Sequence, residues 1–125
     1  MSNLHTLSLA VVDDEAQVLE SVGNLLESAG ADVHLYSSAQ SLLDNEGLAT
    51  IDCLIADISM LGMDGFELRL VARRIRANLP VILISGRFDA VSAAAIAMDA
   101  LLFLPKPLVA RDLVNMVRVA AGSRD

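Results

Sequence analysis

Aromatic side chains and cysteine are scarce in this chain. Aromatics make up 3% of its 125 residues, tryptophan is absent, and Cys53 is the single cysteine. The core must therefore be built from aliphatic side chains and methionine, and no internal disulfide can form. Cys53 lies in an apolar stretch and is expected to be a small buried core residue, which fits a reducing cytoplasm.

Basic charge is low as well, and long apolar runs are missing. The chain has 9 lysines and arginines against 16 acidic residues, which leaves a formal net charge of −7. A domain this acidic repels nucleic acid, so direct nucleic-acid binding is not expected. No apolar run approaches the roughly 20 residues of a membrane helix, and residues 1–6 lack the basic flank of a signal peptide. We expect a cytoplasmic protein without a membrane partner.

Aliphatic sequence is abundant, since 54% of the residues are hydrophobic, and one compact domain over residues 1–125 is expected. Short apolar runs alternate with longer amphipathic stretches, and several runs are apolar almost throughout. Strands that are buried on both faces of a parallel sheet have this pattern. The predicted strands are residues 7–12, 33–36, 53–56, 81–84 and 101–104.

The stretches between the runs have the period of amphipathic helices. The first such stretch is followed by Gly30, a typical C-terminal stop. Ser37 with Gln40 resembles a capping box that begins the second helix, and Asp64 with Glu67 resembles one that begins the third.

A fourth helix is predicted over residues 91–97, and a fifth ends before Gly122. Strand–helix alternation repeated in this way predicts an α/β fold, a doubly wound parallel (βα)5 sheet with right-handed crossovers. The apolar face of the fifth helix comprises Leu113, Met116, Val117 and Ala120.

Polar side chains follow the predicted strands at the points where they end. In open α/β sheets, ligands bind outside the carboxyl ends of the strands, so these side chains are expected at one edge. Each of them taken alone is most simply a helix cap, a turn residue or a surface lysine. Their occurrence at four strand ends favours a joint function. The residues are Asp13 and Asp14, Asp57, Ser85, and Lys106.

The chemistry of this set favours phosphoryl transfer. Clustered carboxylates raise one another's pKa unless a cation neutralises them, and Mg²⁺ accepts carboxylate, carbonyl and water ligands. A carboxylate can act as a nucleophile and form an acyl phosphate. A bound Mg²⁺, the lysine and the serine hydroxyl would then interact with the phosphoryl oxygens.

Together these segments resemble the receiver domain of response regulators in bacterial two-component signalling. The matching segments are residues 11–15, 57–65, 84–86 and 103–107, and the likeness extends from about Leu7 to the last helix. The resemblance implies a flavodoxin-like sheet with strand order 2-1-3-4-5. It also implies a phosphoprotein of a phosphorelay, which catalyses only its own phosphorylation and dephosphorylation and is not otherwise an enzyme.

The resemblance implies a role for each acidic residue. Asp57 would be the phosphoacceptor, charged from a phosphohistidine on a sensor histidine kinase or from a phosphotransfer protein. Asp14 would ligate Mg²⁺ directly and Asp13 largely through water. Asp57 itself and the backbone carbonyl of Ser59 would be the further ligands.

The resemblance also implies a conformational switch. Ser85 would be the switch hydroxyl, Phe103 the switch aromatic, and Lys106 would hold the phosphoryl oxygens. The bond from Lys106 to Pro107 would be cis. The readout surface would consist of the fourth helix, the fifth strand and the fifth helix, through which a homodimer is also expected to form.

Leu61 and Asp99 are two of the positions at which the chain departs from the family pattern. Leu61 stands where many relatives have proline, so the loop after Asp57 is expected to be less rigid. Asp99 stands where many have glycine. Ser59 and Arg87 are expected to affect the lifetime of the phosphoryl group in opposite directions, and the sequence does not show which effect is larger. The cognate kinase and the presence of an output domain are also left open by the sequence.

Three other functions compete with the receiver interpretation. A pseudo-receiver would act by binding alone, but Asp57, Lys106 and the acid pair are retained. A phosphatase with an aspartyl nucleophile, of the haloacid dehalogenase type, needs a second acid where Ser59 stands. A flavodoxin-like cofactor binder needs a hydroxyl- or glycine-rich loop after the first strand, where this chain has Asp13 and Asp14.

Overall fold

The computed structural model describes residues 4–86 and 102–122. The predicted fourth helix, Arg87 and Asp99 lie outside the described residues. The elements in chain order are β1 (Ser8–Val12), α1 (Ala16–Ser28), β2 (Asp32–Tyr36), α2 (Ala39–Asp44), β3 (Cys53–Asp57), α3 (Gly65–Ile75), β4 (Val81–Ser85), β5 (Leu102–Pro105) and α5 (Ala110–Gly122).

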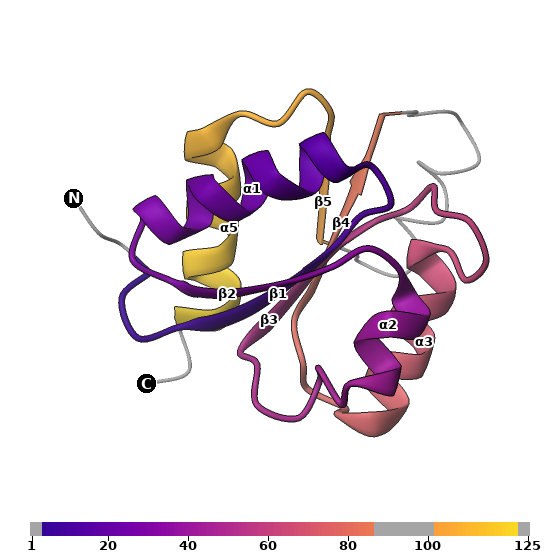
Figure 1. The fold of residues 1–125 in the computed structure, drawn as a ribbon. Helices are drawn as coiled ribbons and strands as arrows, with labels where there is room; N and C mark the ends of the chain where they lie inside the picture. The colour runs from indigo at the N-terminus through magenta and orange to yellow at the C-terminus, as the bar shows by residue number, and fades with distance from the viewer. Residues whose placement is uncertain (1–3, 87–101, 123–125) are drawn as a thin grey trace.

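The strands form one parallel sheet in the order β2-β1-β3-β4-β5, which confirms the predicted doubly wound, flavodoxin-like fold. Helices α1 and α5 cover one face of the sheet, while α2 and α3 cover the other (Figure 1). The order reverses after β2, so β1 and β3 are neighbours at the centre. Crevices at such a reversal are the usual ligand sites of this architecture.

The central strands β3 and β4 are apolar up to their last residues, because each of their faces contacts a helix layer. Every residue of β3 and β4 is buried. Cys53 and Ile55 pack with residues of α1 and α5, whereas Leu54 and Ala56 pack with residues of α2 and α3. Strand β2 has a neighbour on one side only and is half exposed.

Cys53 occupies the buried core position that the sequence predicts. Its side chain is 0% exposed. Burial, and secondarily the nearby Asp52 carboxylate, raise the pKa of the Cys53 thiol to about 12. The thiol is therefore uncharged at neutral pH.

The helix starts follow the capping rules, with one correction. Helix α3 begins with the predicted capping box, in which the Glu67 N–H donates to Asp64 Oδ1 at 2.9 Å and the Asp64 N–H donates to Glu67 Oε1 at 3.0 Å. The prediction for α2 is wrong by one residue. Ser38 is the N-cap, and its Oγ accepts from the Ser41 N–H at 3.0 Å.

Two glycines were expected to lie beyond helix ends. Gly30 does follow α1, with a φ of 104° that suits glycine. Gly122 is instead the last residue of α5, whose buried residues are Leu113, Val117 and Ala121. None of the helices in the described ranges is long and apolar enough to cross a bilayer.

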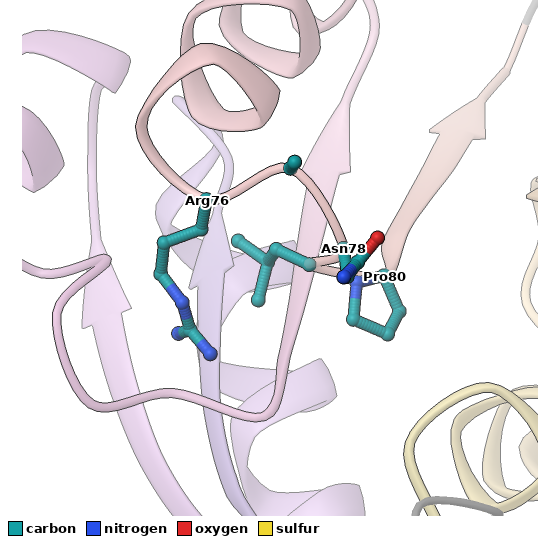
Figure 2. A pocket seen from close by; sticks show the side chains of 5 residues that line it. Arg76, Asn78 and Pro80 are labelled. Carbon is teal, nitrogen blue, oxygen red and sulfur yellow. The ribbon is translucent and has the colours of Figure 1, made fainter.

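Arg76 ties the end of α3 to the loop between α2 and β3. Its Nη1 donates to Leu48 O at 2.9 Å and to Ile51 O at 2.5 Å. A cavity of about 420 Å³ lies beside it, lined also by Ala77, Asn78, Leu79 and Pro80. Figure 2 shows the Arg76 side chain extending away from Asn78 and Pro80. This cavity is at the amino end of β4, opposite to the carboxyl ends where the acidic residues were predicted.

Candidate functional site

The carboxyl ends of β1 and β3 bring three carboxylates together. Asp13 follows β1, and Asp57 is the last residue of the adjacent strand β3. Both side chains are buried, at 3% exposure, whereas Asp14 is exposed. Each of the three residues offers one carboxylate oxygen, and these oxygens all lie within 4.8 Å of one another. The predicted acid cluster is thus present.

Lys106 follows β5 and places its ammonium between two of these carboxylates. Its Nζ lies 3.4 Å from Asp13 Oδ2 and 3.3 Å from Asp57 Oδ1. The Lys106 N–H donates to Ser85 O at 2.8 Å, which anchors the residue to the end of β4. The Lys106–Pro107 bond is cis, as the resemblance implies.

Burial and the proximity of other carboxylates are the main influences on the pKa values of the site. Burial and the neighbouring Asp13 raise the pKa of Asp57, and Lys106 offsets only part of this effect. Burial alone would lower the pKa of Lys106, but Asp13 and Asp57 together raise it. The site therefore favours additional positive charge beside Asp57.

The carboxylate oxygens differ in their hydrogen bonds. Asp13 Oδ1 accepts from the Glu15 N–H at 2.9 Å, and Asp14 Oδ2 accepts from the Leu61 N–H at 3.0 Å. Asp57 Oδ1 is buried and has no hydrogen-bond partner among the described residues. Although Lys106 Nζ is near it, their geometry is that of an ion pair and not of a hydrogen bond.

This donor set fits a hard divalent cation. Three clustered carboxylates with one unsatisfied buried oxygen match the oxygen ligands that Mg²⁺ prefers. Buried acidic oxygens of this kind are normally satisfied by hydrogen bonds or by a metal ion.

The remaining predicted residues lie on the same edge or close to it. Ser85 is the buried last residue of β4, next to the β3 strand that carries Asp57. Phe103 lies on β5 and packs partly buried against the core under α2 and α3. Ser59 is exposed in the loop after β3.

Two further residues contact the site, although the sequence predicted no role for them in it. Glu15 Oε1 lies 3.5 Å from Lys106 Nζ, so a third carboxylate contacts this ammonium. The only sequence signal for it is its place directly after the acid pair. Leu61 contributes a backbone N–H to Asp14, which a side-chain pattern cannot indicate.

Comparison with known sequences gives one family. The model of the response regulator receiver domain family matches residues 9–118. The response regulator protein TmoT of Ectopseudomonas mendocina is 35% identical over 111 residues, covering 88% of this chain and 50% of that protein. The transcriptional regulatory protein TdiR of Thauera aromatica is 36% identical over 111 residues, covering 88% of this chain and 49% of that protein. The chain spans about half the length of the curated relatives it matches.

Solved structures agree with the sequence relatives. A response regulator receiver domain protein from Clostridium thermocellum superposes with a TM-score of 0.84 at 29% identity, covering 94% of this chain and 96% of that one. Full-length FixJ from B. japonicum superposes with a TM-score of 0.81 at 30% identity, covering 93% and 58%. With the fold, the acid cluster and these relatives in agreement, the chain belongs to the response regulator receiver domain family of two-component systems.

Proposed function

We propose that this domain accepts a phosphoryl group on Asp57 from a phosphohistidine of a sensor histidine kinase or of a phosphotransfer protein, in a Mg²⁺-dependent reaction in the cytoplasm. One observation carries the proposal. Lys106 Nζ lies between Asp13 and Asp57 at the edge of the sheet where Asp14 adds a third carboxylate to the cluster. A nucleophile, a cation site and a fixed ammonium are the parts that aspartyl phosphorylation needs.

In the proposed reaction the ionised Asp57 carboxylate attacks phosphorus. A bond forms between a carboxylate oxygen and phosphorus, the bond from phosphorus to the donor imidazole nitrogen breaks, and its electron pair stays on that nitrogen. The Lys106 ammonium, already 3.3 Å from Asp57 Oδ1, compensates part of the charge that the phosphoryl group adds. Asp13, Asp14, Asp57 and the Ser59 carbonyl would hold Mg²⁺, which supplies charge neutralisation on the phosphoryl oxygens when bound.

The readout is proposed to begin at Ser85. Its hydroxyl would donate to a phosphoryl oxygen, and Phe103 would then move inward as the adjacent loop shifts. The switching surface would comprise the fourth helix, β5 and α5. An apolar groove of about 440 Å³ between β5 and α5 supports a partner surface or a homodimer interface there, and it is lined by Leu102, Leu104, Asp112, Asn115, Met116, Val119 and Ala120.

The test is incubation with acetyl phosphate and Mg²⁺, followed by intact mass spectrometry and peptide mapping. We expect a Mg²⁺-dependent gain of one phosphoryl group on Asp57, and none in Asp57→Asn. Full retention of acid-labile phosphate in that variant would contradict the assignment. Failure of the parent with both acetyl phosphate and a kinase would instead favour a pseudo-receiver that acts by binding.

A second variant separates chemistry from switching. Lys106→Ala keeps the acceptor and the cation site, so it should still accept some phosphoryl group while losing the coupled structural change. The comparison is the pattern of NMR shifts on β5 and α5 before and after phosphorylation. A pattern identical to that of the parent would refute the coupling role of Lys106.

A further inference from the structure

A backbone N–H of the loop after β3 donates a hydrogen bond to the acid cluster. The Leu61 N–H donates to Asp14 Oδ2 at 3.0 Å, and the two residues are 47 positions apart in the sequence. Within the described ranges this is the one hydrogen bond that Asp14 makes. A proline at position 61 would have no N–H to donate, so the contact depends on the residue type that stands here.

Asp14 needs such a contact more than its neighbours do. Asp13 is buried and is held by the Glu15 N–H and by Lys106, and Asp57 is buried beside Lys106. Asp14 is exposed and has no cationic partner among the described residues. Repulsion from two nearby carboxylates favours rotation of its side chain into solvent, where its charge is better hydrated.

We propose that the Leu61 N–H is a positioning group that holds the Asp14 carboxylate toward Asp13 and Asp57, so that a divalent cation meets a preformed set of oxygens. A carboxylate has about four lone-pair sites, so it can accept this N–H and ligate a cation at the same time. The Leu61 side chain takes no part, because it is 87% exposed. The inference rests on the proposed function, since the cation site is the one that would serve Asp57.

The decisive variant removes the Leu61 N–H and keeps the Leu61 side chain. Replacing Leu61 by its α-hydroxy acid, through semisynthesis of the full chain, converts the amide to an ester and keeps the side chain. Partners that orient metal ligands typically contribute about 10–100-fold in affinity, and we expect about tenfold weaker Mg²⁺ binding because Asp14 is exposed. Isothermal titration calorimetry of the unphosphorylated protein gives the Kd.

Two controls isolate the hydrogen bond. Leu61→Ala keeps the N–H and should bind Mg²⁺ like the parent. An ester at Met60, whose N–H makes no hydrogen bond within the described residues, controls for backbone chemistry as such. Leu61→Pro removes the same N–H in a genetically encoded variant and should weaken binding in the same direction.

Each outcome decides the inference. Equal Kd values for the parent and the Leu61 ester would overturn it, and so would tighter binding by the ester, since the N–H would then compete with the cation. Phosphorylation of Asp57 at saturating Mg²⁺ is measured separately. If the parent is phosphorylated but the Leu61 ester binds Mg²⁺ as tightly as the parent, only the positioning role is refuted. If the ester binds Mg²⁺ more weakly but the parent is never phosphorylated, only the proposed function is refuted.

Discussion

The Asp57 carboxylate is buried next to a second carboxylate, Asp13, and both features lower the free energy of unfolding when Asp57 is ionised. Its carboxylate is 3% exposed, and burial and Asp13 raise its pKa despite Lys106. A raised pKa in the folded state means that the folded protein binds the Asp57 proton more tightly than the unfolded chain does. The free energy of unfolding therefore falls as pH rises from the ordinary pKa of the group to its raised value.

Asp57→Asn should consequently stabilise the protein in the absence of Mg²⁺. Asparagine keeps the shape and removes the charge, and single stabilising substitutions commonly contribute about 0.5–2 kcal/mol. Urea denaturation in EDTA measures the difference. The gain should be full above the raised pKa of Asp57 and should vanish below its ordinary pKa. A variant less stable than the parent at pH 7 would mean that the attraction to Lys106 outweighs burial and repulsion.

Helix α3 begins so close to Asp57 that only glycine fits at its first residue. A Cβ at Gly65 would lie 2.6 Å from Asp57 O and 2.8 Å from Ile58 Cα, and these backbone atoms cannot move aside cheaply. The Gly65 N–H also donates to Ile58 O at 3.0 Å. The start of α3 and Asp57 are therefore packed backbone to backbone.

Gly65→Ala should destabilise the protein by about 1–3 kcal/mol, the usual range for overpacking. The matched control is Gly122→Ala, where the nearest atom is the Arg118 Cγ at 3.8 Å, an ordinary contact. Because alanine favours helix over glycine by about 1 kcal/mol, that control should be neutral or slightly stabilising. Thermal unfolding of both variants makes the comparison, and equal Tm values would show that α3 shifts without cost.

Element boundaries show where sequence reasoning ends. The third and fourth strands were predicted to end at residues 56 and 84, but Asp57 and Ser85 continue them. A polar side chain ends a hydrophobic run, whereas the backbone hydrogen bonds of the sheet extend past it. Ser37 and Ser38 have the same side chain, so residue type alone does not choose between them as the N-cap, and the structure has Ser38 in that place.

The site was predictable to the extent that it follows from topology. A parallel sheet places all its carboxyl ends on one edge, so Asp13, Asp14, Asp57 and Lys106 are expected at that edge. The Leu61 N–H was not predictable because it belongs to the backbone. Leucine at this position led to the expectation of a less rigid loop, yet its N–H links that loop to Asp14.

The whole molecule carries a net charge of −7, and its acidic cluster concentrates part of that charge at one edge. Mg²⁺ should therefore raise the Tm of the parent, since a ligand that binds only the folded state stabilises it by about 2.7 kcal/mol at 100 times its Kd. Differential scanning calorimetry with and without Mg²⁺ tests this. Sodium chloride at equal ionic strength controls for screening. Asp14→Asn should lose most of the Mg²⁺-specific increase, and an undiminished increase would place the cation elsewhere.

Cys53, at the centre of the sheet, provides a reporter for all these comparisons. A thiol reagent reacts with the thiolate, and this side chain is 0% exposed with a pKa of about 12. Since no other cysteine exists in the chain, modification can proceed only when the sheet opens around β3. The labelling rate of the unaltered protein therefore reports the population of states in which the sheet is open. The same rate, measured for each variant with and without a cation, ranks them by the free energy of this opening.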